Sequence, residues 1–388
     1  MYRLVNGSYL SFADGFIKGD LLFDKIIKSE ELGNKGHEEI FNIDITGLKV
    51  IPGLIDIHTH GAVGYDFISA SPADIAAAAG FFAKNAVTSF FPTTITAPMG
   101  TILTAVKNIV DASHITSIDS TIAGVHIEGP YISPGYRGVH DPSFIRLPDI
   151  KQFDLIKSIL DDELTLLFTV APEIPGGMEF IKYAVINSGT ISIGHSGADG
   201  CIVKEAINNG AVSFTHLFNG MKGINHREPG VAGTALNSDC FVELICDGQH
   251  VCPDIIDLVY KIKGDDRIVL VTDSMQAAGQ GDGDYTFGGM LTKVRNGAAR
   301  NSDGRLAGST LTLYQSVKNI MKYTGIPLEK AVRMVSLNPA RVTGIDKITG
   351  SIDYGKRADL AVIDEYLNIR YVFSKGRKVY DYHAQNEG

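Results

Sequence analysis

The chain has 388 residues, of which 44% are hydrophobic and 20% charged, so it can bury a large core and we expect a folded globular protein. Its formal net charge of -9 argues against nucleic-acid or anionic-membrane partners, because both select for basic stripes. The four cysteines form no Cys-x-x-Cys pair, which indicates buried thiols in a reducing compartment. Neither a signal-peptide core nor a membrane-length apolar run is found, so we expect a cytoplasmic protein.

Both ends of the chain have a sequence pattern typical of short β-strands. Short apolar stretches broken by turn pairs fill residues 1–51. The same pattern returns from residue 350 in "GSIDYGKRADLAVIDEYLNIRYVFSKGRKVYD". We expect residues 1–51 and 350–388 to pair into one small discontinuous β-sandwich domain.

Residues 52–349, between these ends, alternate apolar β-type runs with helical ones. The eight runs are "GLIDIHTH", "VTSFFPTT", "TIAGVHIEG", "LTLLFTVAPE", "TISIGHS", "AVSFTHLFN", "CFVELICDG" and "RIVLVTDS". Ser71 before Pro72 is a good N-cap for the first helix. Near-continuous apolar strands that alternate with helices favour a parallel α/β sheet, and eight of them suit a closed (β/α)8 TIM-like barrel. An open doubly wound sheet is the competing arrangement.

Unusual polar residues stand where these strands finish. They are His58, His60, Glu128, His195, His216 and Asp273. In a (β/α)8 barrel the carboxyl ends of the strands meet at one mouth, so these residues would become neighbours. His58 and His60 are two apart on one strand and therefore point the same way. Alone this pair is a weak signal, but six such residues at five strand ends indicate one site.

Imidazoles with a few carboxylates suit zinc, iron, manganese or cobalt, and the lack of nearby cysteines argues against a closed structural zinc site. Glu128 could bridge two divalent ions, one held by His195 and His216 and the other by His58 and His60. A one-metal site on Glu128, His195 and His216 stays open. Asp273 could be a metal ligand, or a general base and acid, or both.

Longer motifs carry a family resemblance. The motifs are "VIPGLIDIHTHG", "GVHIEGPYISP", "RGVHDP", "ISIGHSGA", "FTHLFNGM", "HREPGVAG", "CDGQHV", "LVTDSM" and "RLAGSTLTL". Together they resemble the N-acetylglucosamine-6-phosphate deacetylase family of the amidohydrolase superfamily, from about residue 48 to 360. The resemblance implies hydrolysis of the acetamide of N-acetyl-D-glucosamine 6-phosphate to D-glucosamine 6-phosphate and acetate. It also implies a homodimer in which the arginine of "HREPG" reaches the neighbouring site.

The resemblance assigns roles residue by residue. Glu128, His195 and His216 match the most constant metal ligands, Asp273 the catalytic acid/base, and His140 the histidine that polarises the acetamide carbonyl. Because the sequence keeps both His58 and His60, it resembles the branch with two metals per chain. Matching substrate-binding positions are Val139, His140, Asn219, Gly220, Arg227, Asp247, Gly248, Gln249, His250, Leu306, Ala307 and Gly308, with Arg227 and His250 on the phosphate.

Several alternatives remain at this level. An N-acetylgalactosamine-6-phosphate deacetylase would differ only at the sugar 4-hydroxyl. Many cyclic amidases bridge their metals with a lysine on the fourth strand, which "LTLLFTVAPE" lacks, and a non-catalytic barrel is a remote possibility. His126 could orient Glu128 or merely pack. The glycine-rich residues 277–289 suit a mobile flap over the site.

Overall fold

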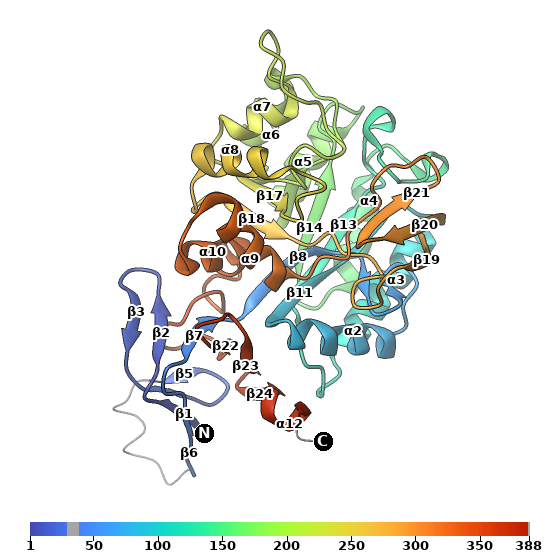
Figure 1. Cartoon of the computed structure of the whole chain (residues 1–388). Helices are drawn as coiled ribbons and strands as arrows, with labels where there is room; N and C mark the ends of the chain where they lie inside the picture. The colour runs from blue at the N-terminus through green and yellow to red at the C-terminus, as the bar shows by residue number, and fades with distance from the viewer. Residues whose placement is uncertain (29–38, 387–388) are drawn as a thin grey trace.

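Eight parallel strands form the centre of the computed structural model, which describes residues 1–28 and 39–386 (Figure 1). In order around the sheet they are β8 (Leu54–Thr59), β11 (Val87–Thr94), β13 (Gly124–Glu128), β14 (Thr165–Val170), β15 (Gly189–Ile193), β16 (Ser213–Phe214), β17 (Phe241–Ile245) and β18 (Ile268–Val271). A short strand, β12 (Thr121–Ile122), leads into β13 and pairs with β11. All eight predicted strands are therefore present.

The sheet closes between its last and first strands. The amide of Asp273 donates to the carbonyl of His58 at 2.9 Å, and the amide of His60 donates to the carbonyl of Ser274 at 2.8 Å. Thr59 and Ser274 form a parallel bridge at the same place. An open sheet would leave β8 and β18 unpaired, so the closed barrel is confirmed and the doubly wound alternative is wrong.

A helix follows each barrel strand and covers its outer face. These are α2 (Pro72–Lys84), α3 (Met99–Ser113), α4 (Ile150–Ile159), α5 (Gly177–Ile186), α6 (Gly200–Asn208), α7 (Gly230–Leu236), α8 (Pro253–Lys263) and α9 (Leu313–Thr324). Ser71 caps α2 in a capping box with Asp74, as its sequence predicts. No helix in the described part of the chain is long and apolar enough to cross a membrane.

The interior of the barrel is filled by apolar side chains at its amino-terminal end. Two further helices, α10 (Leu328–Val335) and α11 (Leu337–Thr343), follow α9. Ala340 and Val342 of α11 pack against Ile55 of β8 and Val269 of β18 in one apolar cluster. The barrel is therefore a plugged scaffold whose mouth carries any site.

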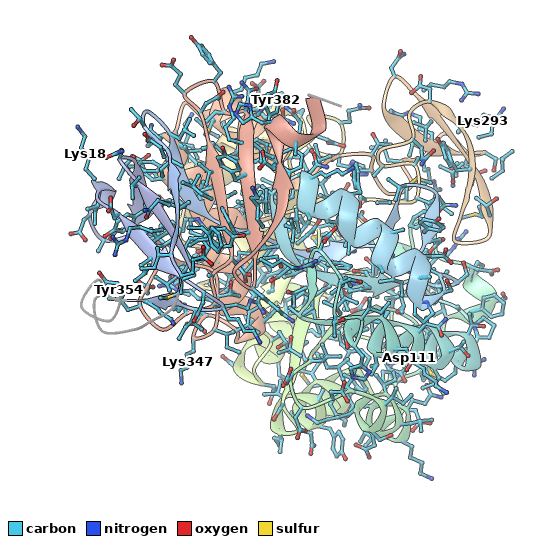
Figure 2. The ribbon with its side chains drawn as sticks, turned by 90° about the horizontal axis from the view of Figure 1, so that it is seen from below. Lys18, Asp111, Lys293, Lys347, Tyr354 and Tyr382 are labelled. Atoms are coloured by element: carbon cyan, nitrogen blue, oxygen red, sulfur yellow. The ribbon has the colours of Figure 1, made fainter. Side chains whose placement is uncertain are left out.

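The two chain ends form a separate unit of two sheets. A six-stranded sheet has the order β24 (Arg377–Asp381), β23 (Ile369–Ser374), β22 (Leu360–Ile363), β7 (Lys49–Pro52), β2 (Ser8–Ser11), β3 (Gly15–Lys18). A four-stranded sheet has the order β5 (Ile27–Lys28), β4 (Leu21–Phe23), β1 (Tyr2–Val5), β6 (Phe41–Asp44). Phe23 and Phe373 meet edge-to-face between them at 5.0 Å. Figure 2 shows strands from the two ends side by side, which confirms the predicted sandwich.

A small antiparallel sheet follows β18, and we call it the arm: β19 (Gly283–Phe287), β20 (Met290–Arg295) and β21 (Ala298–Asn301). It projects from the barrel, with Lys293 exposed on it (Figure 2). Within residues 277–289, where the sequence suggests a mobile flap, residues 283–287 form β19, and the mobility of this segment stays a prediction. Asn296 and Gly297, both at positive φ, make the two-residue turn that joins β20 to β21.

The remaining short elements are β9 (Gly61–Ala62), β10 (Tyr65–Asp66), the 3-10 turns η1 (Pro134–Tyr136) and η2 (Pro142–Phe144), and α12 (Tyr382–Asn386). All four cysteines are free. The expectation of buried thiols is wrong for Cys201 and Cys252, which are exposed at the starts of α6 and α8.

Candidate active site

A cavity of about 360 Å³ opens at the mouth of the barrel, where the carboxyl ends of the strands meet. It brings together most of the predicted site residues: His60, Glu128, Val139, His140, His195, His216, Asn219, Gly220, His250, Asp273, Leu306 and Gly308. Residues absent from the prediction also line it, among them Ile95, Phe287, Arg300 and Arg305. Phe287 and Arg300 come from the arm, which therefore forms one wall of the cavity.

Glu128, His195 and His216 form the first cluster of possible metal ligands. Glu128 Oε1 lies 3.1 Å from His195 Nε2 and 2.9 Å from His216 Nε2, and the two imidazole nitrogens are 3.1 Å apart. All three side chains are buried. One oxygen and two nitrogens thus converge on a single point from three different strands.

His58, His60 and Asp273 form the second cluster. His58 Nε2 and His60 Nε2 are 3.3 Å apart, and Asp273 Oδ1 lies 3.6 Å from the former and 3.3 Å from the latter. Glu128 joins the two clusters, because its Oε2 is 3.1 Å from His60 Nε2 while its Oε1 faces the first cluster. Glu128 therefore lies between the two clusters, and its role as a bridge between two ions stays a prediction.

The donor set fits divalent ions. His195 Nδ1 is 2.9 Å from the carbonyl oxygen of Tyr136, which can only accept, so Nδ1 carries the proton and neutral His195 offers a bare Nε2. This nitrogen faces the carboxylate of Glu128 and the imidazole of His216. Several electron-pair donors therefore lie close together, and a cation bound among them would stabilise the arrangement. Within each cluster the ligand atoms lie within 4.8 Å of one another.

The electrostatics of the clusters also favour positive charge. Burial alone would lower the pKa of His60, yet hydrogen bonds to Asp273 and Glu128 raise it to about 9. Burial opposes ionisation of Glu128, but the histidines around it, His58 first, hold its pKa well below the usual range. The carboxylates thus stay ionised and stabilise positive charge between them, which protons or divalent ions can supply.

Three of the ligand candidates have unusual backbone conformations. The φ angles of His195, His216 and Asp273 are 47°, 31° and 48°, in the left-handed region that residues other than glycine rarely adopt. Each costs of order 1–3 kcal/mol and persists only where the surroundings enforce it. Strain at three strand ends that face one cavity marks that cavity as functional.

His140 differs from His195 in its tautomer. Its Nδ1 accepts from the backbone N–H of Thr96 at 3.3 Å, and Thr96 Oγ1 is 2.7 Å away. The proton therefore lies on Nε2, which is 3.4 Å from Glu128 Oε2. Burial lowers the pKa of His140 to about 4, so the ring stays neutral. His140 thus presents an N–H donor to the cavity instead of a lone pair.

Close packing requires a glycine beside His195. Gly220 has a φ of 55°, and a Cβ there would lie 2.7 Å from His195 Nδ1. Its neighbour Asn219 also lines the cavity. The sequence "FNGM" thus lets the loop after β16 pass directly over the imidazole.

The remaining predicted substrate residues fall into two groups. His250 lines the cavity, and Asp247 Oδ2 holds its Nδ1 at 2.7 Å while Oδ1 accepts the amides of Gln249 and His250. Positions outside the lining are Arg227, Asp247, Gly248, Gln249 and the buried Ala307. Arg227 is exposed and does not line the cavity of its own chain. Its phosphate role stays a prediction.

Two buried carboxylates beside the site were missed in the sequence. Glu243 and Asp56 are fully buried carboxylates within apolar strands; Glu243 contacts the ring of His58, and Asp56 binds Thr272 Oγ1 at 2.6 Å. A lone charge inside an apolar run was the signal, since such a group needs a specific partner. His126 instead bonds to Thr93 and Thr169 and, among the described contacts, makes no hydrogen bond to Glu128.

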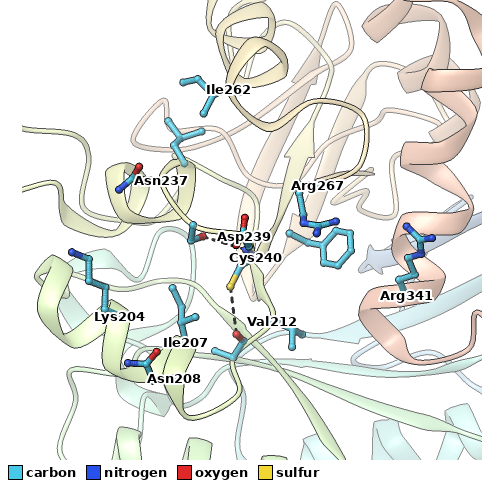
Figure 3. Close-up of a pocket in the computed structure, with 14 residues that line it drawn as sticks. Lys204, Ile207, Asn208, Val212, Asn237, Asp239, Cys240, Ile262, Arg267 and Arg341 are labelled. Atoms are coloured by element: carbon cyan, nitrogen blue, oxygen red, sulfur yellow. Dashed lines mark hydrogen bonds between the residues drawn. The ribbon is translucent and has the colours of Figure 1, made fainter.

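A larger cavity of about 1020 Å³ lies at the opposite end of the barrel (Figure 3). Lys204, Arg267 and Arg341 stand around it, together with residues that precede β16, β17 and β18. Neither metal-ligand cluster reaches it. We therefore place the chemistry in the smaller cavity, where convergent titratable groups lie.

The fold and the cavity together define a class: a (β/α)8 hydrolase whose mouth gathers imidazoles and carboxylates suited to divalent metal. The model of the amidohydrolase family matches residues 49–379. Because this match spans most of the sequence, the chain belongs to the amidohydrolase family.

Individual relatives of the chain are named as deacetylases of sugar phosphates. The chain is 37% identical over 340 residues to the N-acetylglucosamine-6-phosphate deacetylase of Vibrio furnissii, covering 87% of this chain and 85% of that protein. It is 36% identical over 327 residues to the N-acetylgalactosamine-6-phosphate deacetylase of Escherichia coli O157:H7, covering 84% and 86%. The crystal structure of N-acetylglucosamine-6-phosphate deacetylase from Pasteurella multocida matches with a TM-score of 0.89 at 32% identity, covering 97% of this chain and 99% of that one. The resemblance inferred from the motifs is confirmed.

Proposed function

We propose that this chain hydrolyses the acetamide of N-acetyl-D-glucosamine 6-phosphate to D-glucosamine 6-phosphate and acetate, in amino-sugar catabolism. The observation that carries the proposal is the position of Glu128, whose two oxygens face two histidine clusters in a cavity that Asp273 and His140 also line. The names of the relatives from Vibrio furnissii and Pasteurella multocida support the same substrate.

Amide hydrolysis needs an activated water, a polarised carbonyl and a proton for the departing amine. Divalent ions held by the two clusters would acidify water and polarise the carbonyl oxygen. Asp273 is held as a carboxylate by His60 and His58, against the effect of its burial, so it can accept the proton of the attacking water. The same carboxyl then passes that proton to the leaving nitrogen. His140 Nε2–H donates to the carbonyl oxygen as negative charge develops there.

We propose His58, His60 and Asp273 as ligands of one ion and His195 and His216 as ligands of the other, with Glu128 between them. Zinc, iron, manganese and cobalt all suit this donor set. A single ion on Glu128, His195 and His216 is the alternative. Elemental analysis of protein prepared without added metal identifies the ion and its stoichiometry.

The substrate phosphate would be bound by His250 of the same chain and by Arg227. Because Arg227 is exposed outside its own cavity, we propose that it reaches the cavity of a second copy in a homodimer. An arginine presents a planar fork of donors suited to a phosphate dianion. The chain would act in the cytoplasm, with residues 52–349 as the catalytic domain and 1–51 plus 350–388 as the sandwich.

N-acetyl-D-galactosamine 6-phosphate is the second candidate substrate, because the Escherichia coli relative is named for it at nearly equal identity. The deciding experiment compares kcat/KM for acetate release from the two sugar phosphates by metal-replete protein. Equal values would refute a glucosamine preference. Metal-replete protein that releases acetate from neither would leave only the non-catalytic barrel.

A further inference from the structure

Glu243 is a buried carboxylate that the proposed mechanism does not use. It sits at the centre of β17 with 0% of its surface exposed, and the side chains of its neighbours Val242 and Leu244 point to the opposite face of the sheet. Within the described chain, neither lysine nor arginine pairs with it. A charge in such a place needs a specific partner, because desolvation of an ionised carboxylate is unfavourable.

Its partners are ligand candidates from both clusters. Glu243 Oε2 lies 3.1 Å from the ring Nδ1 of His58 and 3.3 Å from the backbone N–H of His216. Oε1 has no hydrogen-bond partner among the described residues. A single oxygen therefore contacts the side chain of one ligand and the main chain of another.

The contact with His58 fixes how that ring faces the site. A carboxylate only accepts, so Nδ1 carries the proton and neutral His58 offers a bare Nε2 to His60 and Asp273. His60 lacks such control, since its Nδ1 is buried with no partner in the described structure. Among the described residues, the second cluster thus contains one histidine whose Nδ1 has an acceptor and one whose Nδ1 has none.

We propose that Glu243 is a positioning residue that holds His58 in its metal-binding tautomer and thereby sets the affinity of the second metal site. This inference rests on the two-metal form of the proposed function. Carboxylates that accept from the far nitrogen of a ligand histidine commonly change metal affinity by about 10- to 100-fold when removed. The competing explanation is that Glu243 only ties β17 to the loop at His216.

Two variants and a control separate these explanations. Glu243→Gln keeps an acceptor of the same shape without the charge, and Glu243→Met removes the acceptor. Asp56→Asn is the matched control, because Asp56 is an equally buried carboxylate that bonds the backbone N–H of His58 and not its ring. Each metal-stripped protein is equilibrated with buffered free zinc, and zinc per chain is measured by elemental analysis, with Tm recorded in parallel.

We expect two zinc ions per wild-type chain, with the weaker one bound about 10-fold less tightly in Glu243→Gln and about 100-fold less tightly in Glu243→Met. Asp56→Asn should lower Tm while keeping both affinities. In a His58→Ala background, Glu243→Gln should cause no further loss of zinc, because the residue acts through that ring. If Glu243→Met fails to fold, Glu243→Gln and the double variant with His58→Ala still test whether Glu243 acts through the ring of His58.

Two results with the variants would overturn the inference: unchanged zinc binding in both Glu243 variants with only a lower Tm, or an equal loss of zinc affinity in Asp56→Asn. A wild-type chain that binds a single zinc at saturation would overturn it as well. Acetate release is measured separately. Zinc affinities that behave as expected in a chain that releases no acetate would reject the proposed activity and leave the role of Glu243 intact.

Discussion

The tautomer of His140 leads to a prediction about polarisation of the carbonyl. His140→Ala removes a side chain that is 1% exposed and directs Nε2–H into the cavity. Loss of one preorganised donor to a developing oxyanion costs about 10²–10³ in kcat, or roughly 2.7–4 kcal/mol. The truncation also leaves the Thr96 N–H without its acceptor, which lowers stability by about 1–3 kcal/mol. We expect both effects, with KM changed much less than kcat.

The assay combines acetate release at saturating substrate, Tm and metal content. His140→Gln retains an N–H donor of similar reach and should recover part of kcat. His126→Gln is the control, since His126 is an equally buried imidazole that bonds two threonines outside the cavity lining. It should lower Tm and largely keep kcat. A His140→Ala protein that retains more than about a tenth of kcat, or that loses metal, would refute the donor role.

Other substitutions at the mouth test the remaining roles. Asp273→Asn should keep most of its metal by elemental analysis, because an amide oxygen can still bind an ion, and should lose most of kcat, because an amide cannot take the proton of water; loss of metal would make Asp273 mainly a ligand. His58→Ala combined with His60→Ala should lower metal content from two ions per chain toward one. Arg227→Ala should raise KM for phosphorylated substrates far more than for N-acetylglucosamine, and equal losses would contradict the phosphate role. Mixing Arg227→Ala chains with Asp273→Asn chains should restore activity, since one mixed site then has both residues; no recovery would argue against action across a dimer.

The barrel was predictable because its signal is local in the sequence. Parallel strands buried on both faces are mainly apolar, so β18 appears as an uninterrupted apolar run, and unusual polar residues such as Asp273 stand just after strand ends of this kind. Closure of the barrel then brings those ends together. His195 and Glu128 are 67 residues apart in sequence, yet their ligand atoms meet at 3.1 Å.

Contacts that depend on the register between strands could not be predicted in this way. Glu243 and His58 are 185 residues apart, and their pairing exists only because closure of the barrel leaves a single strand, β18, between β17 and β8. The tautomer of His140 likewise depends on Thr96, in the loop after another strand. The arm had a local signal in the sequence, the Asn296–Gly297 turn. The glycine-rich residues 277–289 before it made the segment look like a loop.

The number of metals is therefore more than a property of the motif that contains His58 and His60. In the proposed two-metal form those two residues would supply the nitrogens, but a nitrogen binds metal only when its lone pair is free and aimed at the site. Glu243 meets that condition for His58, just as the carbonyl of Tyr136 does for His195. A related chain with both histidines and no acceptor at the position of Glu243 should bind its second metal weakly. Predicting the number of metals from a sequence therefore requires the residues of β17 as well as those of β8.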